Sequence, residues 1–186
     1  MIAWVDLETT GLNPWRGSIL EIALVLTDDN LNEIDFIHSL VMPRRPLAED
    51  MDDYVRKMHT ENGLLDELSK GAPASFDVEA AIADWIRPRG PMGDTPLAGS
   101  TVGFDRAWLK DQMPYTEKQF HYRSIDVSSI KLLANRWAPE LVKQRPRPTK
   151  AAHRALDDIR ESINELKFYR SHFMVCEIGA HRSEVL

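Results

Sequence analysis

The chain has 186 residues, 43% of them hydrophobic, so it is long enough to bury one sizeable core and short for two. Its formal net charge of −6 argues against a protein that grips long nucleic acid through a positive surface, because phosphate neutralisation supplies most of that affinity. We therefore expect a single globular domain whose anionic ligands, if it has any, are short or locally held.

The sequence also indicates where the protein resides. It has no run of about 20 uncharged apolar residues, the length that spans a bilayer, and no basic N-terminal region leading into an apolar segment. The lone Cys176 has no internal partner for a disulfide, which fits a reducing compartment. We expect a cytoplasmic protein that does not associate with a membrane.

Residues 2–5 are apolar at every position, which is typical of a central strand covered on both faces. Asp6 and Glu8 follow directly. Because strand side chains repeat every second residue, both carboxylates leave the same face, roughly 7 Å apart along the strand. Burying two anions together is costly unless cations neutralise them, so the pair is a candidate metal cradle. A strand that ends in solvent explains this short pattern equally well. Gly11 slightly favours the metal cradle over the solvated strand end, since glycine permits a tight backbone path near a ligand.

Further strands and helices follow along the chain. Residues 18–26 and 34–41, joined by a polar turn, predict an antiparallel meander with the first strand. Strands paired with a following helix are then expected twice, which describes a mixed sheet with helices on its faces. The expected strands are 96–101 and 122–126, and the expected helices are the acidic segment beyond Pro46, then 77–87, 105–112 and 127–137.

The segment 139–150 combines prolines with closely spaced charges and is predicted to be a mobile basic loop. Arg145, Arg147 and Lys150 could guide an anion there, although a merely solvated loop is the simpler interpretation.

A long final helix is predicted over residues 151–169. Its apolar stripe comprises Ala152, Leu156, Ile159, Ile163 and Leu166. At about 100° per residue, Asp158 lies at the edge of this stripe and Asp157 points to solvent. His153 can share a site with Asp158 only if it belongs to the loop before the helix; otherwise it is a surface histidine at a helix end.

Taken alone, Asp105 would be an ordinary acid near a helix N-terminus. The whole set, in order and spacing, resembles the DEDDh exonuclease superfamily: Asp6, Glu8, Asp105, His153 and Asp158. Residues 51–64, 120–137 and 153–173 narrow the resemblance to oligoribonucleases. The chain departs from them at Thr9, Tyr54 and Thr101, in the segment 142–150, and in the tail 174–186, whose role is unknown.

The resemblance implies an α/β fold, with a ribonuclease-H-like mixed five-stranded sheet flanked by helices over residues 1–173. It implies a 3′-to-5′ exoribonuclease that releases nucleoside 5′-monophosphates from very short RNA by a two-metal-ion mechanism. Four carboxylates from Asp6, Glu8, Asp105 and Asp158 would balance two divalent cations, and all-oxygen ligation suits Mg²⁺ or Mn²⁺. His153 would be the general base.

The resemblance also implies how short RNA is held. Leu12 would wedge between the bases, and Tyr122 would reach in from the second subunit of a homodimer. Other substrate contacts would come from Tyr54 and His59, and a cap for the 5′-phosphate would come from Thr101, His121, Arg123 and Ser128. Two alternatives stay open: a broader DEDDh exonuclease of the proofreading or RNA-trimming type, acting on longer single strands, and an inactive nucleic-acid-binding module on the same fold.

Overall fold

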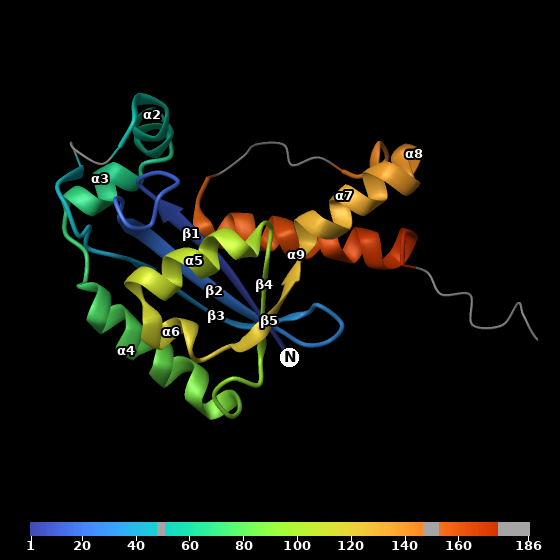
Figure 1. Ribbon diagram of the computed structural model, residues 1–186, viewed down its shortest axis with the longest axis horizontal. Coiled ribbons are helices and arrows are strands. Elements are labelled where there is room, and N and C mark those ends of the chain that lie inside the picture. The colour runs from blue at the N-terminus through green and yellow to red at the C-terminus, as the bar shows by residue number, and fades with distance from the viewer. Residues whose placement is uncertain (48–50, 147–152, 175–186) are drawn as a thin grey trace, which may run out of the picture.

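The protein is described by a computed structural model over residues 1–47, 51–146 and 153–174 (Figure 1). Its centre is a five-stranded mixed sheet with the strand order β3-β2-β1-β4-β5. The strands are β1 (Ile2–Thr9), β2 (Ile19–Thr27), β3 (Glu33–Leu40), β4 (Pro96–Gly99) and β5 (His121–Asp126). The first three strands form an antiparallel meander, and β4 and β5 continue the sheet in parallel. The predicted mixed five-stranded sheet is confirmed.

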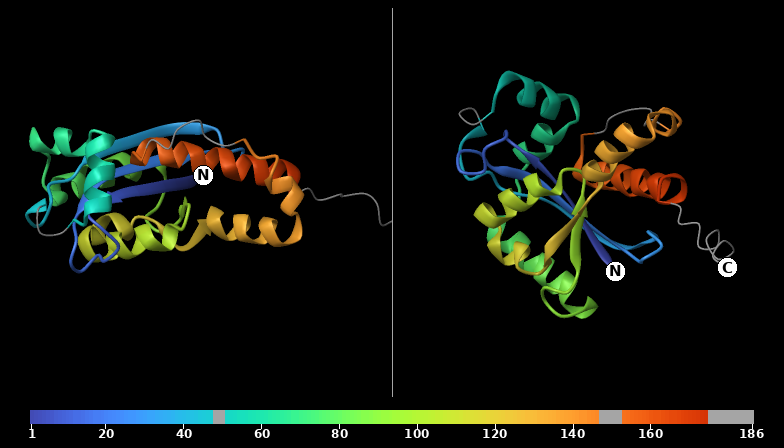
Figure 2. Two further views of the ribbon diagram at one scale, coloured as in Figure 1. Left: turned by 90° about the horizontal axis from the view of Figure 1, so that it is seen from above. Right: turned by 45° about the vertical axis from the view of Figure 1, so that its right-hand side comes forward.

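Helices cover both faces of the sheet, and α9 lies on the opposite side of the strands from α5 (Figure 2). One face packs against α4 (Ser75–Ile86) and α5 (Val102–Gln112), and the other against α7 (Val127–Trp137) and α9 (Ala155–His172). Smaller elements complete the described chain: α2 (Asp53–Glu61), α3 (Leu64–Ser69), the 3₁₀ turn η1 (Arg87–Arg89), α6 (Pro114–Glu117) and α8 (Pro139–Val142).

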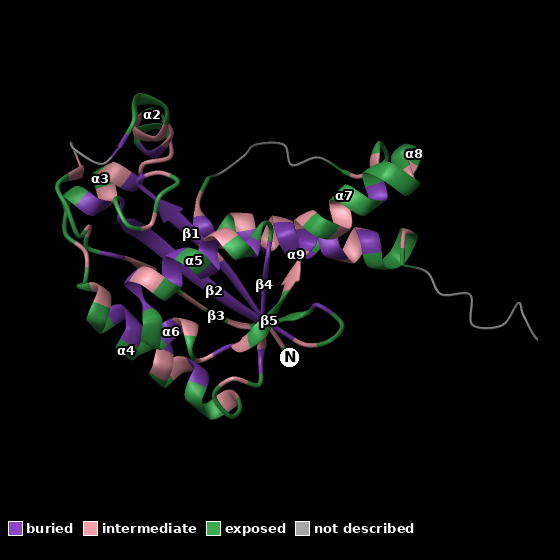
Figure 3. Ribbon diagram, in the orientation of Figure 1, coloured by how far each residue is buried: buried purple, intermediate pink, exposed green. Residues whose placement is uncertain are grey.

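The alternation of side chains along β1 decides what each face of the sheet meets. Ala3, Val5 and Leu7 belong to the core shared with α4 and α5. Trp4 points the other way, into the core shared with α7 and α9. Because Asp6 and Glu8 have the same parity as Trp4, their carboxylates leave the sheet on the α9 side. The central strands are buried over most of their length (Figure 3), as a strand covered by two helical layers requires.

Several predicted boundaries need correction. The helix expected to open at Asp105 begins at Val102, because Thr101 adopts a left-handed conformation (φ 59°) that turns the chain from β4 directly into a helix. The expected basic loop begins with the short helix α8. Arg145 lies 3.5 Å from the buried Glu165 and so does not project freely toward an anion. Arg147, Lys150 and the tail from residue 175 lie outside the described residues.

The final helix begins at Ala155, four residues later than predicted. Its buried positions include Ala155, Ile159, Ile163 and Leu166, and Ala152 lies outside the described residues. Over the described residues, no helix combines the length and apolar character needed to cross a membrane.

Candidate active site

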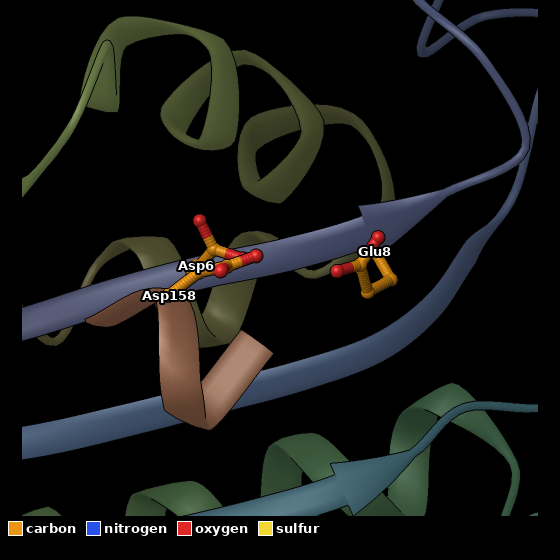
Figure 4. A group of neighbouring side chains, drawn as sticks. All are labelled: Asp6, Glu8 and Asp158. Atoms are coloured by element: carbon orange, nitrogen blue, oxygen red, sulfur yellow. The ribbon is translucent and has the colours of Figure 1, made fainter. Parts of the chain in front are cut away.

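Three carboxylates gather at the end of β1. Asp6, Glu8 and Asp158 each offer an oxygen within 4.8 Å of the others' oxygens. Figure 4 shows Asp6 on β1 beside Asp158 from the start of α9, with Glu8 further along the strand. Segments this far apart in the sequence meet because α9 packs on the face of the sheet to which the even-numbered β1 side chains point. Oxygen ligands of this kind suit a hard divalent cation.

The fourth predicted carboxylate, Asp105, lies outside that group of three. It is buried in the first turn of α5, and its charge bears on Asp6. The parallel pairing of β4 with β1 accounts for this neighbourhood, since the carboxyl ends of parallel strands meet at the same edge of a sheet.

Crowding and burial make these acids hard to ionise. Burial, followed by the charges of Asp105 and Glu8, raises the pKa of Asp6 well above its ordinary value. Burial, followed by the charge of Asp158, raises the pKa of Glu8 to about 8. Burial raises the pKa of Asp105 to about 7 and the pKa of Asp158 to about 6. A bound cation would relieve this cost, because it favours the charged form of every carboxylate around it.

His153 lies in the loop before α9, which is the placement that a shared site with Asp158 requires. Its backbone is left-handed (φ 46°), its side chain is exposed, and its carbonyl accepts a hydrogen bond from the Asn62 side chain. The helix then begins two residues later. As predicted, Asp158 is half-buried and Asp157 is exposed.

A charged cluster that the sequence did not predict holds this loop. Arg154 donates three hydrogen bonds to Glu21 on β2 (2.8 and 3.0 Å to Oε1, 3.2 Å to Oε2) and two to Glu67 on α3 (2.8 and 2.9 Å). Glu21 is 1% exposed and also contacts His38 (2.5 Å) and the amide of Ala155 (3.2 Å). The signal in the sequence was a single glutamate inside an otherwise apolar strand, which needs a cationic partner.

The loop between β1 and β2 presents Leu12 to solvent, with 87% of its surface exposed. Leu12 is therefore not a core residue that closes the turn after β1. Gly11 has no positive φ and has open space around it, so its own conformation in this loop does not require glycine. The glycine that this loop needs is Gly17, where a Cβ would come within 2.7 Å of the Trp108 ring. Tyr54 is also exposed.

His59, by contrast, is fully buried. Its Nε2 lies 2.9 Å from the carbonyl oxygen of Thr9, and its Nδ1 faces Glu8 at 3.8 Å without a hydrogen-bond partner among the described residues. In this arrangement the ring supports the end of β1 and does not reach the surface where a substrate would bind.

The residues expected to cap a 5′-phosphate form two groups. Thr101 and Ser128 lie together, with their hydroxyl oxygens 3.0 Å apart. Asp126, at the end of β5, fixes both, because its Oδ1 accepts hydrogen bonds from their backbone amides. At the start of β5, the rings of His121 and Tyr122 lie 4.4 Å apart, and the Arg123 guanidinium lies 5.2 Å from the centre of the Tyr122 ring. Tyr122 is 73% exposed.

Comparison with known proteins agrees with this geometry. The exonuclease family model RNase_T matches residues 3–166. The oligoribonuclease of Tropheryma whipplei (strain Twist) is 44% identical over 174 residues, covering 93% of both chains. The oligoribonuclease of Corynebacterium glutamicum (strain R) is 41% identical over 180 residues, covering 96% of this chain and 82% of that one.

Among solved structures, the fold is similar to exonuclease I of Methylocaldum szegediense, with a TM-score of 0.67 and 19% identity over 93% of this chain. It is also similar to E. coli exonuclease I in complex with a 5cy-dT13 oligonucleotide, with a TM-score of 0.68 and 18% identity. This chain spans 41% of the length of each of those two proteins, so the similarity concerns the fold of one part of them.

Proposed function

Since the chain belongs to the oligoribonuclease family of exonucleases, we propose the following assignment of its activity to its residues. The protein is a 3′-to-5′ exonuclease that degrades short oligoribonucleotides. The observation that supports the residue assignment is the meeting of Asp6, Glu8 and Asp158 within 4.8 Å, with Asp105 buried close by. Residues 1–173 would form the exonuclease domain.

We propose that these four carboxylates hold two divalent cations, Mg²⁺ or Mn²⁺. The residues fit such ions: they are all oxygen donors, and their raised pKa values indicate a site that needs positive charge. Two bound cations would supply positive charge to the attacking and the leaving oxygen of the phosphodiester. Asp158 on α9 and Asp105 on α5 both lie near the end of β1, where they would hold the two cations in place.

His153 would be the general base. Its exposed imidazole stands on the loop that leads into α9, and the unprotonated ring nitrogen of an imidazole can accept a proton from the attacking water. The 3′-oxygen of the next nucleotide would leave, and a nucleoside 5′-monophosphate would be released. His153→Ala should therefore lower turnover strongly while leaving metal affinity intact.

The substrate would be held from two sides. Exposed Leu12 and Tyr54 would contact the bases, and the 5′-phosphate would be capped by donors from Thr101, His121, Arg123 and Ser128. His59 would act indirectly, by holding Thr9 and Glu8. We also propose a homodimer in which Tyr122 reaches the partner's site; exposure of Tyr122 on β5 and of Leu132 and Trp137 on α7 supports an interface there.

The test is hydrolysis of 5′-phosphorylated RNAs from two to ten nucleotides, with and without a chelator, combined with sedimentation. We expect metal-dependent release of nucleoside 5′-monophosphates, fastest from the dinucleotide, by a protein that sediments as a dimer. In the cell, we propose that it degrades short RNA fragments in the cytoplasm. A monomer with full activity, or faster degradation of the ten-nucleotide RNA, would favour the broader exonuclease. Absence of turnover would favour the inactive binding module.

A further inference from the structure

The start of β5 departs from regular pairing just where Tyr122 and Arg123 stand. Pro96 on β4 is opposite His121, and the next residue of β4, Leu97, is opposite Ser124. One step along β4 therefore corresponds to three along β5, so that Tyr122 and Arg123 are the two extra residues of a bulge. A bulge leaves backbone groups without ladder partners and turns side chains to new directions. Here it turns Tyr122 outward.

The carbonyls around this bulge are bound by one buried side chain. Arg106 of α5 is 7% exposed, and its guanidinium donates to the carbonyl oxygens of His121 (2.5 Å) and Tyr122 (2.9 Å) and to the Ser124 hydroxyl (2.8 Å). A planar guanidinium with five donors can make these bonds at once, whereas a lysine ammonium cannot reproduce that fork.

The guanidinium is also held from the other side. Its Nε donates to Glu117 Oε1 at 3.0 Å, an ion pair that compensates the buried charge. Within the bulge, the amide of Arg123 donates to Nδ1 of His121 at 3.1 Å, so that Nε2 is the ring nitrogen left free to face outward. The backbone at 121–124 is thus set by contacts that do not use the outward-facing ends of His121, Tyr122 and Arg123.

We propose that Arg106 is a positioning residue for substrate recognition: by binding the bulged carbonyls of His121 and Tyr122, it presents the side chains of Tyr122 and Arg123 to the 5′-phosphate end of short RNA. This inference rests on the proposed function, in which these side chains contact the substrate. Arg106 neighbours Asp105 in sequence but faces β5, so its contribution concerns the substrate's phosphate and not the metal ions.

The experiment compares two dinucleotide RNAs that differ only in a 5′-phosphate, and its readout is the ratio of the two kcat/KM values for each variant. Partial unfolding scales both values equally and leaves the ratio unchanged. Arg106→Lys should lower the ratio about tenfold, as expected for a weakened charge-assisted contact to phosphate. Ser124→Ala, which removes one acceptor of the guanidinium, should lower it about threefold. Glu117→Gln is the matched control and should keep the wild-type ratio, because the amide oxygen of Gln can still accept from Nε of Arg106 and the bonds from Arg106 to β5 stay in place.

Hydrogen exchange at residues 121–124 gives a second readout that is independent of activity, and it should accelerate in Arg106→Lys but not at residues 19–27. A wild-type ratio near one would refute the proposed 5′-phosphate cap, and the exchange data would still report on Arg106. A wild-type ratio above one that Arg106→Lys and Ser124→Ala leave unchanged would overturn the inference itself. An equal loss in Glu117→Gln would also overturn it, because the ratio would then depend on the charge of Glu117 and not on the bonds from Arg106 to β5. If Arg106→Lys does not fold, Ser124→Ala decides alone.

Discussion

Replacing Arg154 by alanine should destabilise the protein far more than its position at a helix end suggests. Arg154 joins β2, α3 and the loop before α9 through Glu21 and Glu67. Burial opposes ionisation of Glu21, but hydrogen bonds from His38 and Arg154 lower its pKa to about 2. Glu21 is therefore a buried anion at neutral pH, and Arg154→Ala removes its main cationic partner.

The two partners of Arg154 differ in burial, so losing each ion pair should lower the free energy of unfolding by a different amount. Glu21 is 1% exposed, and breaking a buried pair costs about 3 to 5 kcal/mol. We expect about 3 kcal/mol, because the His38 ring and the Ala155 amide remain bound to Glu21. Glu67 has a 42% exposed side chain, so Glu67→Ala should cost under about 1 kcal/mol. For a chain of this length, about 3 kcal/mol lowers the melting temperature by about 6 to 12 °C.

Urea unfolding of wild type, Arg154→Ala, Glu67→Ala and the double variant Arg154→Ala with Glu21→Gln would test this. The double variant should recover most of the loss, because an uncharged side chain no longer needs a cation. The sign with pH follows from the lowered pKa of Glu21: the stability it contributes is present above about pH 4.5 and is lost as pH falls toward 2. Equal losses of stability in Arg154→Ala and Glu67→Ala would refute the reasoning. So would a double variant in which Glu21→Gln restores none of the stability lost in Arg154→Ala.

Three further predictions follow from the site. Asp158→Ala should nearly abolish hydrolysis of a dinucleotide while the exposed neighbour variant Asp157→Ala keeps it within about twofold; equal losses in a kinetic assay would contradict the assignment of α9. Leu12→Ala should raise KM for the dinucleotide with a melting temperature within about 1 °C of wild type, because this exposed side chain contributes little to the core; a lower melting temperature with unchanged KM would disprove a role in base contact. The pKa of Glu8 is raised to about 8, so the folded protein favours the protonated form of Glu8, and the stability linked to that form is lost as pH rises toward 8. In the presence of a chelator, the melting temperature should therefore fall progressively from pH 5 to 8. Added Mn²⁺ should reverse this trend in a thermal unfolding series.

Local periodicity in the sequence determined much of this protein. The run of apolar residues at 2–5 predicted a strand buried on both faces, and the two-residue repeat placed Asp6 and Glu8 on one side of it. The helix predicted over 127–137 has those bounds in α7. The 100° step of a helix was enough to separate half-buried Asp158 from exposed Asp157. These features depend only on neighbours within a few positions, which the sequence contains in full.

Contacts between distant segments were decided only by the tertiary structure. Arg154 meets Glu21 across 133 positions, and the buried ring of His59 meets Thr9 across 50. The bulge of β5 and its binding by Arg106 depend on how α5 packs beside the sheet edge, and no periodicity in residues 121–126 marks it. The physical reason is that a buried charge or an unpaired carbonyl must find a partner somewhere. The sequence therefore shows which buried charged or polar groups require a partner, and the packing of the helices on the sheet decides which residue becomes that partner.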